Sequence, residues 1–470
     1  MADFSKLSIG EIKKAFADKK FSSLDITKNL IELIKKNDAG KTDAFLEVFD
    51  EAPDAAREAD KNLKKGKDSP LLGVPIALKD NILVSGKRAT AASKILEGFI
   101  SPYDATVVKR LKDAGAVIVG RTNMDEFAMG SSTENSVYGP TKNPHDPTRV
   151  PGGSSGGSAV AVAAGFVPVA LGSDTGGSIR QPAAFSGVVG LKPSYGRVSR
   201  SGLIALASSL DQIGPFTRSV ADAELVYKVI AGRDPLDSTT VSDESFPRKR
   251  KFSKTIGIPR EFIEIDGIDE SVKKNFEEAV EKFRALGYKI KDLKLPHLKY
   301  SLAVYYIIMP AEASSNLARF DGVKYGFHKA GKDVIEDYFE TRGAGFGPEP
   351  KRRIILGTYV LSSGYYDEYY GSALEMKKLI SEELAEAFEK VDLILTPTTP
   401  TPAFKLGEKT KDPLSMYLAD IFTVPANIAG LPSISLPSGL AGVLPLGIEL
   451  TAALGREDDL FLAGKEFLGE

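Results

Sequence analysis

The chain has 470 residues, of which 42% are hydrophobic and 26% are charged, and its formal net charge is −2. These values are typical of a globular protein with a large core, and the charge gives no electrostatic basis for direct binding to nucleic acid or to an anionic membrane. The sequence contains no cysteine and only three histidines, His145, His297 and His328. Disulfides, thiolate metal sites and cysteine nucleophiles are therefore excluded, and no two of the histidines have the spacing of metal ligands.

Residues 1–65 are predicted to form an N-terminal helical layer. Ser8 and Glu11 have the spacing of a capping box, and a second helical segment with periodic hydrophobic residues begins at Ser23. The start of the sequence lacks the apolar stretch of a signal peptide, which favours the cytoplasm. The longest apolar run, residues 159–172, is too short to span a bilayer, so we expect no membrane partner.

From about residue 66 the pattern changes to alternating strands and helices. Residues 74–78 and 116–119 are predicted strands, and residues 104–114 between them have the pattern of an amphipathic helix. This alternation predicts an α/β protein in which a mixed central β-sheet is flanked by helices on both faces.

The rest of the chain is expected to continue the same unit. Further strands are predicted over 167–171, 255–258 and 391–396, helices over 157–164 and 269–286, and a surface connection over 236–252. No internal repeat is present. We therefore expect one compact unit, in which residues 66–470 form the main domain and carry a helical insertion over about 260–390.

Two glycine-rich segments, residues 150–158 and 172–182, contain most of the candidate catalytic residues. In the second segment a predicted strand leads into Thr175-Gly176-Gly177, and a helix is expected to begin at Ser178. The N–H groups of residues 175 to 178 would then be free to bind an oxyanion beside a Ser178 nucleophile. A structural turn with Ser178 as helix cap explains the local pattern equally well.

The first segment also fits a different catalytic motif. Residues 152–156 match the G-x-S-x-G nucleophile elbow of α/β-hydrolases, which would make Ser154 the nucleophile. That elbow requires a buried strand directly before it, whereas residues 143–151 contain three prolines and no strand-like run. We therefore reject the elbow and expect Ser154 to be held in a loop.

A serine nucleophile needs a base, and Lys79 is the candidate because it ends the predicted apolar strand 74–78. Burial would lower the pKa of this lysine from about 10.4 toward 7, at a cost of roughly 4–5 kcal/mol. The alternative is a strand-end lysine that points into water. The local pattern alone favours that alternative.

Together the motifs closely resemble the amidase signature family. They are GVPIALKD around Lys79, PGGSSGGS around Ser154 and GSDTGGSIRQP around Ser178, and the separations of 75 and 24 residues also fit. The resemblance implies that Lys79 is the base, that Ser154 is a relay held by a cis peptide bond, and that Ser178 is the nucleophile that becomes acylated.

A narrower resemblance covers nearly the whole chain. Segments beginning at Met129, Glu312, Lys351, Ser363 and Met416 are similar to the A subunits of glutamyl-tRNA(Gln) amidotransferases. The resemblance implies a glutaminase that passes ammonia to amidotransferase B and C subunits, with mischarged Glu-tRNA(Gln) or Asp-tRNA(Asn) bound through the B subunit. It also implies no metal or organic cofactor in this chain, while the full complex would use ATP and Mg²⁺.

The same resemblance indicates how glutamine would be held. Free glutamine carries an α-carboxylate and an α-ammonium group, so its pocket needs a cation and an anion. Arg353, with Arg352 as the alternative, would bind the carboxylate through its guanidinium fork, and Asp420 would bind the ammonium. The expected substrate contacts are Met129, Gly130, Tyr305, Arg353 and Asp420.

The chain departs from that family near its C-terminus. Where members have a glycine-containing strand with a glutamine, this sequence reads PLGIELTAA from Pro445, with Glu449 inside the segment. These positions are far from the triad motifs along the sequence, so we expect the catalytic chemistry to be unaffected. The departure puts the last strand and helix in doubt.

Two other functions remain open at this point. A stand-alone amidase of the same family would act on a simple carboxamide and would need no paired charges for an amino acid. A non-enzymatic scaffold would retain the fold, but it would have no use for Lys79 together with both serines. The glutaminase is the function that the sequence favours.

Overall fold

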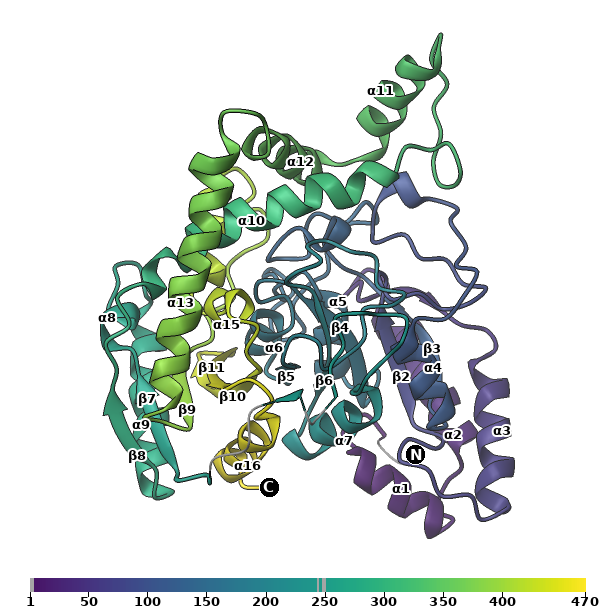
Figure 1. Ribbon diagram of the computed structural model, residues 1–470. Coiled ribbons are helices and arrows are strands. Elements are labelled where there is room, and N and C mark those ends of the chain that lie inside the picture. Colours follow the sequence, from purple (N-terminus) through teal and green to yellow (C-terminus); the bar gives the residue numbers. More distant parts are fainter. Residues whose placement is uncertain (1–3, 243–244, 247–250) are drawn as a thin grey trace.

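The structure is a computed structural model that describes residues 4–242, 245–246 and 251–470. The described chain is built around one sheet of eleven strands in the order β1-β3-β2-β4-β6-β5-β10-β11-β9-β7-β8 (Figure 1). The strands are β1 (Phe45–Val48), β2 (Pro75–Lys79), β3 (Val117–Thr122), β4 (Val169–Asp174), β5 (Val189–Lys192), β6 (Gln212–Thr217), β7 (Thr255–Ile258), β8 (Lys289–Asp292), β9 (Leu393–Pro397), β10 (Ser433–Ala441) and β11 (Leu444–Ala452). Strand β2 is parallel to β3 and β4, and β7 to β8 and β9, whereas the other neighbours are antiparallel. The predicted mixed sheet is confirmed.

Helices cover both faces of this sheet. Every residue of β2, β3, β4 and β6 is buried, and successive side chains along a strand point to opposite faces, so each face must be packed. The helices are α1 (Ile9–Ala17), α2 (Ser23–Asn37), α3 (Ala52–Lys64), α4 (Thr106–Asp113), α5 (Gly156–Ala163), α6 (Arg180–Ser186), α7 (Val220–Ile230), α8 (Arg260–Ile263), α9 (Glu270–Ala285), α10 (Ser301–Asn316), α11 (Val334–Gly345), α12 (Pro348–Val360), α13 (Ser372–Phe388), α14 (Pro413–Tyr417), α15 (Val424–Ile428) and α16 (Glu457–Leu468). The predicted α/β architecture is therefore confirmed.

The first 65 residues contain the helices that the sequence predicts, together with one strand. Helix α1 begins with the expected capping box, in which the N–H of Glu11 donates to Ser8 Oγ and the N–H of Ser8 donates to the Glu11 carboxylate. Strand β1 lies at the edge of the sheet, antiparallel to β3, with Phe45 opposite Thr122. This segment therefore extends the sheet in addition to covering it.

Helices α10 and α12 lie together at one end of the sheet, α13 runs from them down alongside β9, and α11 projects away (Figure 1). Helix α10 packs against both α12 and α13. The predicted helical insertion over 260–390 contains these helices, and it also contains β8, which forms the other edge of the sheet.

Strands β10 and β11 join two halves of the sheet. Strand β10 pairs with β5 on one side, and β11 pairs with β9 on the other. The last strand and helix, which the sequence put in doubt, are both formed as β11 and α16. Of the predicted surface connection over 236–252, residues 243–244 and 247–250 lie outside the described residues.

Candidate active site

Lys79 is the last residue of β2, and it is completely buried because β2 lies between β3 and β4. Its Nζ lies 2.8 Å from the Oγ atoms of both Ser154 and Ser155, and 3.0 Å from Ser173 Oγ. The alternative of a strand-end lysine pointing into water is therefore wrong. A ring of hydroxyl groups surrounds the amine instead.

This environment changes the protonation of the lysine. Burial lowers the pKa of Lys79 to about 7, and the carboxylates of Asp125, Asp174 and Asp211 oppose part of that shift. A lysine with such a pKa is a neutral amine in a large fraction of molecules at neutral pH. It can therefore accept a proton, which an ordinary surface lysine cannot do efficiently.

Ser154 lies in the loop before α5, where the peptide bond between Gly153 and Ser154 is cis. The residues before it form no strand, and Arg149 takes part only in an isolated bridge with Lys405. The context required for a nucleophile elbow is therefore absent from this loop. The N–H of Ser155 donates to the carbonyl oxygen of Ser178 at 3.3 Å, so the loop is adjacent to the second glycine-rich segment.

The prediction that a helix begins at Ser178 is wrong by two residues, because α6 begins at Arg180. The carboxylate of Asp174 accepts the N–H of Gly177 at 2.9 Å and the N–H of Ile179 at 3.0 Å. These side-chain to backbone hydrogen bonds close a turn around Ser178 before the helix can start. Ser178 remains slightly accessible, with 8% of its surface exposed, whereas Ser154 has none.

The N–H groups of this turn differ in their availability. That of Gly177 is used by Asp174, whereas those of Thr175, Gly176 and Ser178 donate to no acceptor within the part of the chain that the structure describes. Such free N–H groups beside a serine hydroxyl can stabilise a developing oxyanion.

Both positions in the turn must be glycine, because neighbouring side chains leave no room for a Cβ atom. A Cβ atom on Gly176 would lie 2.6 Å from Tyr305 Cζ, and one on Gly177 would lie 2.3 Å from Thr423 Oγ1. The hydroxyl of Thr423 lies 2.6 Å from the carbonyl oxygen of Gly176. The structure thus packs Tyr305 directly against the turn that carries Ser178.

Asp420 ends a short 3₁₀ helix, η7 (Leu418–Asp420), and contacts Thr423, which packs against the turn. Its carboxylate accepts a hydrogen bond from Ser131 Oγ at 2.5 Å, and its carbonyl oxygen lies 3.0 Å from Thr423 Oγ1. Burial raises the pKa of Asp420 to about 7, although Ser131 and the positive charge of Arg353 favour ionisation. A cationic ligand would therefore complete this site electrostatically.

Arg353 faces inward from α12 and is 3% exposed. Its guanidinium lies beside the stacked rings of Tyr306 and Tyr417, 5.3 and 5.2 Å from their centroids. Its Nε donates to Glu349 at 2.7 Å, while its Nη2 donates to no acceptor in the described ranges. Arg352, the alternative, is about half exposed and also pairs with Glu349. Of these two arginines Arg353 is thus the buried one, with Nη1 on Met309 Sδ at 3.5 Å and Nη2 free among the described residues.

Met129 and Gly130 lie beside Asp125. Met129 is buried, and a Cβ atom on Gly130 would lie 2.4 Å from Asp125 Cγ. The Asp125 carboxylate accepts the N–H groups of Thr133 and Asn135 at 2.8 and 3.0 Å. Asp125 therefore shapes the loop that brings Ser131 to Asp420.

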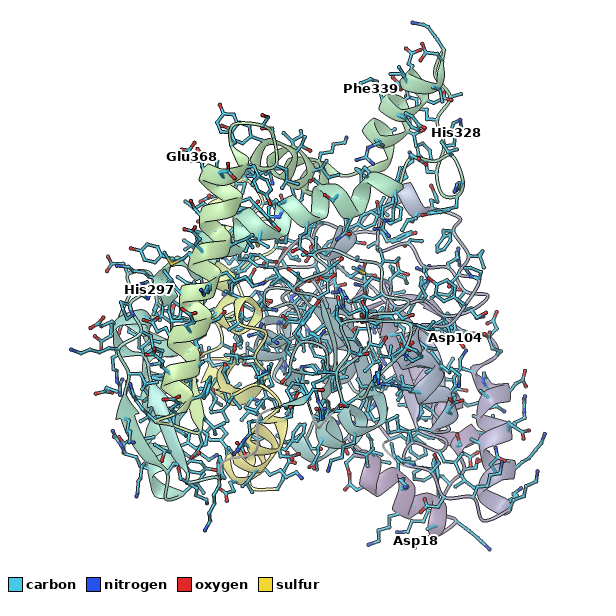
Figure 2. All side chains as sticks on the ribbon, in the orientation of Figure 1. Asp18, Asp104, His297, His328, Phe339 and Glu368 are labelled. Carbon is cyan, nitrogen blue, oxygen red and sulfur yellow. The ribbon has the colours of Figure 1, made fainter. Side chains whose placement is uncertain are left out.

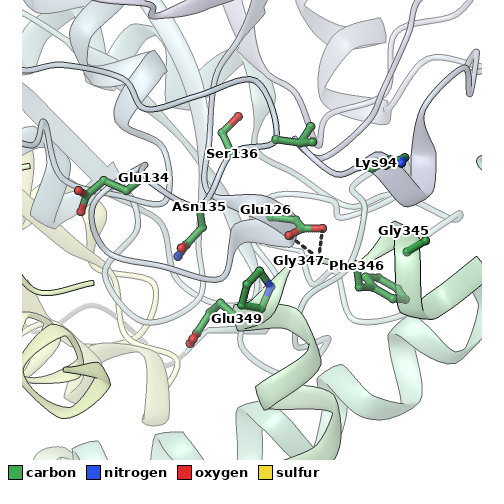
Figure 3. A pocket seen from close by; sticks show the side chains of 12 residues that line it. Lys94, Glu126, Glu134, Asn135, Ser136, Gly345, Phe346, Gly347 and Glu349 are labelled. Carbon is green, nitrogen blue, oxygen red and sulfur yellow. Dashed lines mark hydrogen bonds between the residues drawn. The ribbon is translucent and has the colours of Figure 1, made fainter. Parts of the chain in front are cut away.

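A pocket of about 330 Å³ adjoins Glu349, the partner of Arg353 (Figure 3). The N–H of Gly347 donates to both oxygens of Glu126 at 3.1 and 3.0 Å, which ties the start of α12 to the loop after β3. The pocket lining consists of Lys94, Glu126, Glu134, Asn135, Ser136, Val137 and residues 344–349.

Several residues of the site were not singled out from the sequence. Glu349 stands four residues before Arg353, and this helical i, i+4 spacing of opposite charges is a signal that the sequence does offer. Ser155 directly follows Ser154 in the motif, so the sequence could also have indicated it. The contact of Ser173 with Lys79 offers no such signal, because it depends on how β2 and β4 align.

The three histidines all lie in described parts of the chain. Two of them contact residues outside the Lys79 site, and the third lies at the periphery of the molecule. His145 contacts the carbonyl oxygen of Ser186 at 3.0 Å, and His297 contacts Glu383 on α13 at 3.2 Å. His328 lies beside the projecting α11, and His297 lies on the outer side of α13 (Figure 2). Among the residues described, no group of three or more His, Asp or Glu side chains is arranged to hold a metal ion.

Comparison with known proteins agrees with this geometry. The profile of the amidase family matches residues 25–461, which is nearly the whole chain. The chain belongs to the amidase family. Within the described residues, no helix of this amidase is both long and apolar enough to cross a membrane.

Relatives within the amidase family are similar over almost their full length. The A subunit of the glutamyl-tRNA(Gln) amidotransferase of Carboxydothermus hydrogenoformans is 57% identical, over 94% of this chain and 93% of that protein. The crystal structure of the corresponding protein from Thermotoga maritima has a TM-score of 0.78 and 45% identity, and it covers 98% of this chain and 94% of its own. The peptide amidase of Stenotrophomonas maltophilia has a TM-score of 0.81 at 28% identity, over 99% and 97% of the two chains.

Proposed function

We propose that this amidase is the glutamine-hydrolysing subunit of a tRNA-dependent amidotransferase. The observation that carries the proposal is the pair of opposite charges, Asp420 and Arg353, that both act on Tyr305 beside the Ser178 turn, because a simple carboxamide has no group for either. The identity of 57% with the A subunit of such an enzyme supports the same assignment.

In the proposed reaction, Ser178 attacks the side-chain amide carbon of glutamine. Its proton passes to Ser154, and Ser154 gives its own proton to the neutral amine of Lys79. The contact of 2.8 Å between Lys79 Nζ and Ser154 Oγ supports this route. No histidine is required.

The tetrahedral intermediate carries a negative charge on the former carbonyl oxygen. We assign its stabilisation to the turn from Thr175 to Ser178, in which the N–H groups of Thr175, Gly176 and Ser178 are free in the described chain and that of Gly177 is held by Asp174. Protonated Lys79 then returns the proton through Ser154 to the leaving amine, and ammonia departs. Water hydrolyses the γ-glutamyl ester by the same route, which releases glutamate and restores Ser178.

Glutamine is held in this proposal by its two charged groups. The open edge of Arg353 receives the α-carboxylate, and Asp420 receives the α-ammonium. Tyr305 adds a hydrogen bond from its position against the turn, and the chain at Met129 and Gly130 forms the remaining wall.

The ammonia is used by partner subunits. We assign to this chain a place in a hetero-oligomer with the amidotransferase B and C subunits, in the cytoplasm. The B subunit binds the mischarged tRNA, either Glu-tRNA(Gln) or Asp-tRNA(Asn), and ATP and Mg²⁺ serve the amidation step of the full complex.

The test is steady-state hydrolysis of glutamine against butyramide, measured with and without co-expressed B and C subunits. Glutamine should be preferred, and its hydrolysis should increase when the partners and the charged tRNA are present. If the isolated chain prefers butyramide, and the partners change nothing, the chain is a stand-alone amidase.

A further inference from the structure

A network of buried charges lies behind the turn that carries Ser178. Arg180, the first residue of α6, has no exposed surface. Its Nε and Nη2 donate to the two oxygens of Asp174 at 3.1 and 3.0 Å, and its Nη1 donates to the carbonyl oxygen of Thr423 at 2.7 Å. Asn427 bonds to both members of this ion pair.

Asp174 and Thr423, which Arg180 holds, are the residues that fix the turn. Asp174 accepts the N–H groups on either side of Ser178, those of Gly177 and Ile179. The Thr423 hydroxyl lies 2.6 Å from the carbonyl oxygen of Gly176. The position of Arg180 therefore determines the position of the turn from two directions.

Arg180 has a second acidic partner, which comes from the other end of the chain. Glu449 lies in β11, is 1% exposed, and accepts from Arg180 Nη1 at 2.6 Å and from Ser433 Oγ at 2.6 Å, both on its Oε1 atom. Its Oε2 is buried without a hydrogen-bond partner in the described chain. Although the divergent segment is far from the triad motifs along the sequence, β11 brings Glu449 to Arg180 beside the Ser178 turn.

We propose that Glu449 is a positioning residue for the nucleophile, acting through Arg180 on Asp174 and the turn. The inference rests on the amide hydrolysis proposed above. This role requires the present position of Oε1, because of the two carboxylate oxygens of Glu449 only Oε1 contacts Arg180 and Ser433. Small displacements of a nucleophile and its oxyanion donors reduce turnover strongly, on the order of a hundredfold for about 1 Å.

Two substitutions separate reach from charge. Glu449→Gln keeps an acceptor oxygen at the same distance and removes the charge, so kcat for glutamine should stay within about threefold of wild type. Glu449→Asp keeps the charge, but its side chain is one methylene shorter and its carboxylate no longer reaches Arg180. The value of kcat should therefore fall at least about tenfold, while KM should change less than about twofold. Ser435→Ala is the matched control, because Ser435 lies opposite Glu449 on β10 but contacts Thr398 instead of Arg180. It should leave kcat unchanged.

A second readout does not depend on glutamine. The rate at which a small phosphonofluoridate modifies Ser178, followed by intact mass, should fall about tenfold in Glu449→Asp and remain near wild type in Glu449→Gln. Thermal unfolding is measured for each variant. If Glu449→Asp does not fold, Ser433→Ala replaces it, and the loss of the hydrogen bond that orients Glu449 should reduce labelling about threefold.

The outcomes separate this inference from the proposed function. A wild type that labels at Ser178 but hydrolyses no glutamine even with the co-expressed B and C subunits and the charged tRNA overturns the proposed function and leaves the labelling comparison valid. Equal labelling rates in folded Glu449→Asp and wild type overturn the positioning role. An equal loss in Glu449→Gln and Glu449→Asp overturns it as well, because charge rather than reach would then be decisive.

Discussion

Lys79 Nζ and Ser154 Oγ lie 2.8 Å apart, and neither residue has any exposed surface. The contact joins the end of β2 to a loop 75 residues later in the chain. Because the amine is buried among hydroxyl groups, it can be uncharged at neutral pH and can take a proton from one of them. The activity, its pH dependence and the stability of the protein should all depend on this pair.

The identity of the nucleophile is tested by trapping the acyl-enzyme. Ser178→Ala should abolish glutamine hydrolysis and leave the fold intact, because it removes only one hydroxyl from the turn. In the wild type, a γ-glutamyl adduct should map to Ser178 by peptide mass spectrometry. An adduct on Ser154 or Ser155 would restore the nucleophile elbow.

The identity of the base is tested by a contrast between lysine and histidine variants. Combined replacement of His145, His297 and His328 by Gln should leave substantial activity, since the hydrogen-bond partners of Lys79 are serines and none of them is a histidine among the described residues. Lys79→Ala should remove activity, and Lys79→Arg should not restore it because a guanidinium keeps its proton near neutral pH. A folded but inactive triple histidine variant would contradict the assignment.

The pH profile of kcat should report the pKa of Lys79. Only the neutral amine accepts a proton, so kcat should rise with pH, about tenfold per unit below pH 7, and level off above that value. Lys192, which is also buried with a pKa lowered to about 7 by burial, supplies the control. The rise of kcat with pH should persist in Lys192→Met. If it disappears in that variant, Lys192 and not Lys79 is the group whose titration controls kcat.

Removing the buried amine should stabilise the protein. The pKa of Lys79 is about 7 in the folded state against 10.5 for an ordinary lysine, so the unfolded state binds more protons between these values. The free energy of unfolding therefore rises with pH across this window, and the burial costs on the order of 4–5 kcal/mol at pH 7.

Lys79→Met avoids that cost but loses the hydrogen bonds to the serine hydroxyls, so we expect a net gain of about 1–3 kcal/mol at pH 7. The gain should shrink toward pH 10, because the cost of neutralising the wild-type amine falls as the pH approaches its unfolded-state pKa of 10.5. Urea unfolding of both proteins at the two pH values measures this. A variant that is less stable at pH 7 than wild type would contradict a neutral, buried Lys79.

The pocket charges should control substrate preference. Arg353→Ala and Asp420→Ala should each weaken glutamine use by roughly 2–5 kcal/mol in kcat/KM, which is typical for loss of a buried charged partner. Hydrolysis of butyramide should change little in the same variants, because it has neither charged group. Arg352→Ala is the matched control on α12, since Arg352 is about half exposed, and it should affect glutamine weakly. Equal losses on both substrates would indicate damage to the catalytic residues instead.

Local patterns were sufficient for much of the fold and for the motifs of the site. Strand β2 and helix α4 lie within two residues of their predicted bounds, because apolar runs and amphipathic spacing determine them locally. The turn before Ser178 was also predicted, from its glycines. Its helix begins later than expected because Asp174 competes for the N–H groups, and such side-chain competition is not visible in a hydrophobic pattern.

Contacts between distant strands could not be predicted in this way. Glu449 reaches Arg180 across 269 residues of sequence, and only the order of strands in the sheet brings them together. The burial of Lys79 has the same origin, since a lysine at the end of an edge strand would be solvated. Sheet order is a global property, so neither result follows from the residues around Lys79 or Glu449.

The place of β10 and β11 in the sheet also has a consequence for synthesis on the ribosome. These strands come from the last part of the chain, yet they connect β5 to β9 and so join the two halves of the sheet. Chains emerge N-terminus first, and contacts between distant segments form late. Ser178 and Lys79 are therefore translated long before Glu449 can reach Arg180, and the nascent chain lacks a central part of the sheet until β11 has emerged. An unfinished chain therefore lacks the contact between Glu449 and Arg180 behind the Ser178 turn until the last part of the sequence has been made.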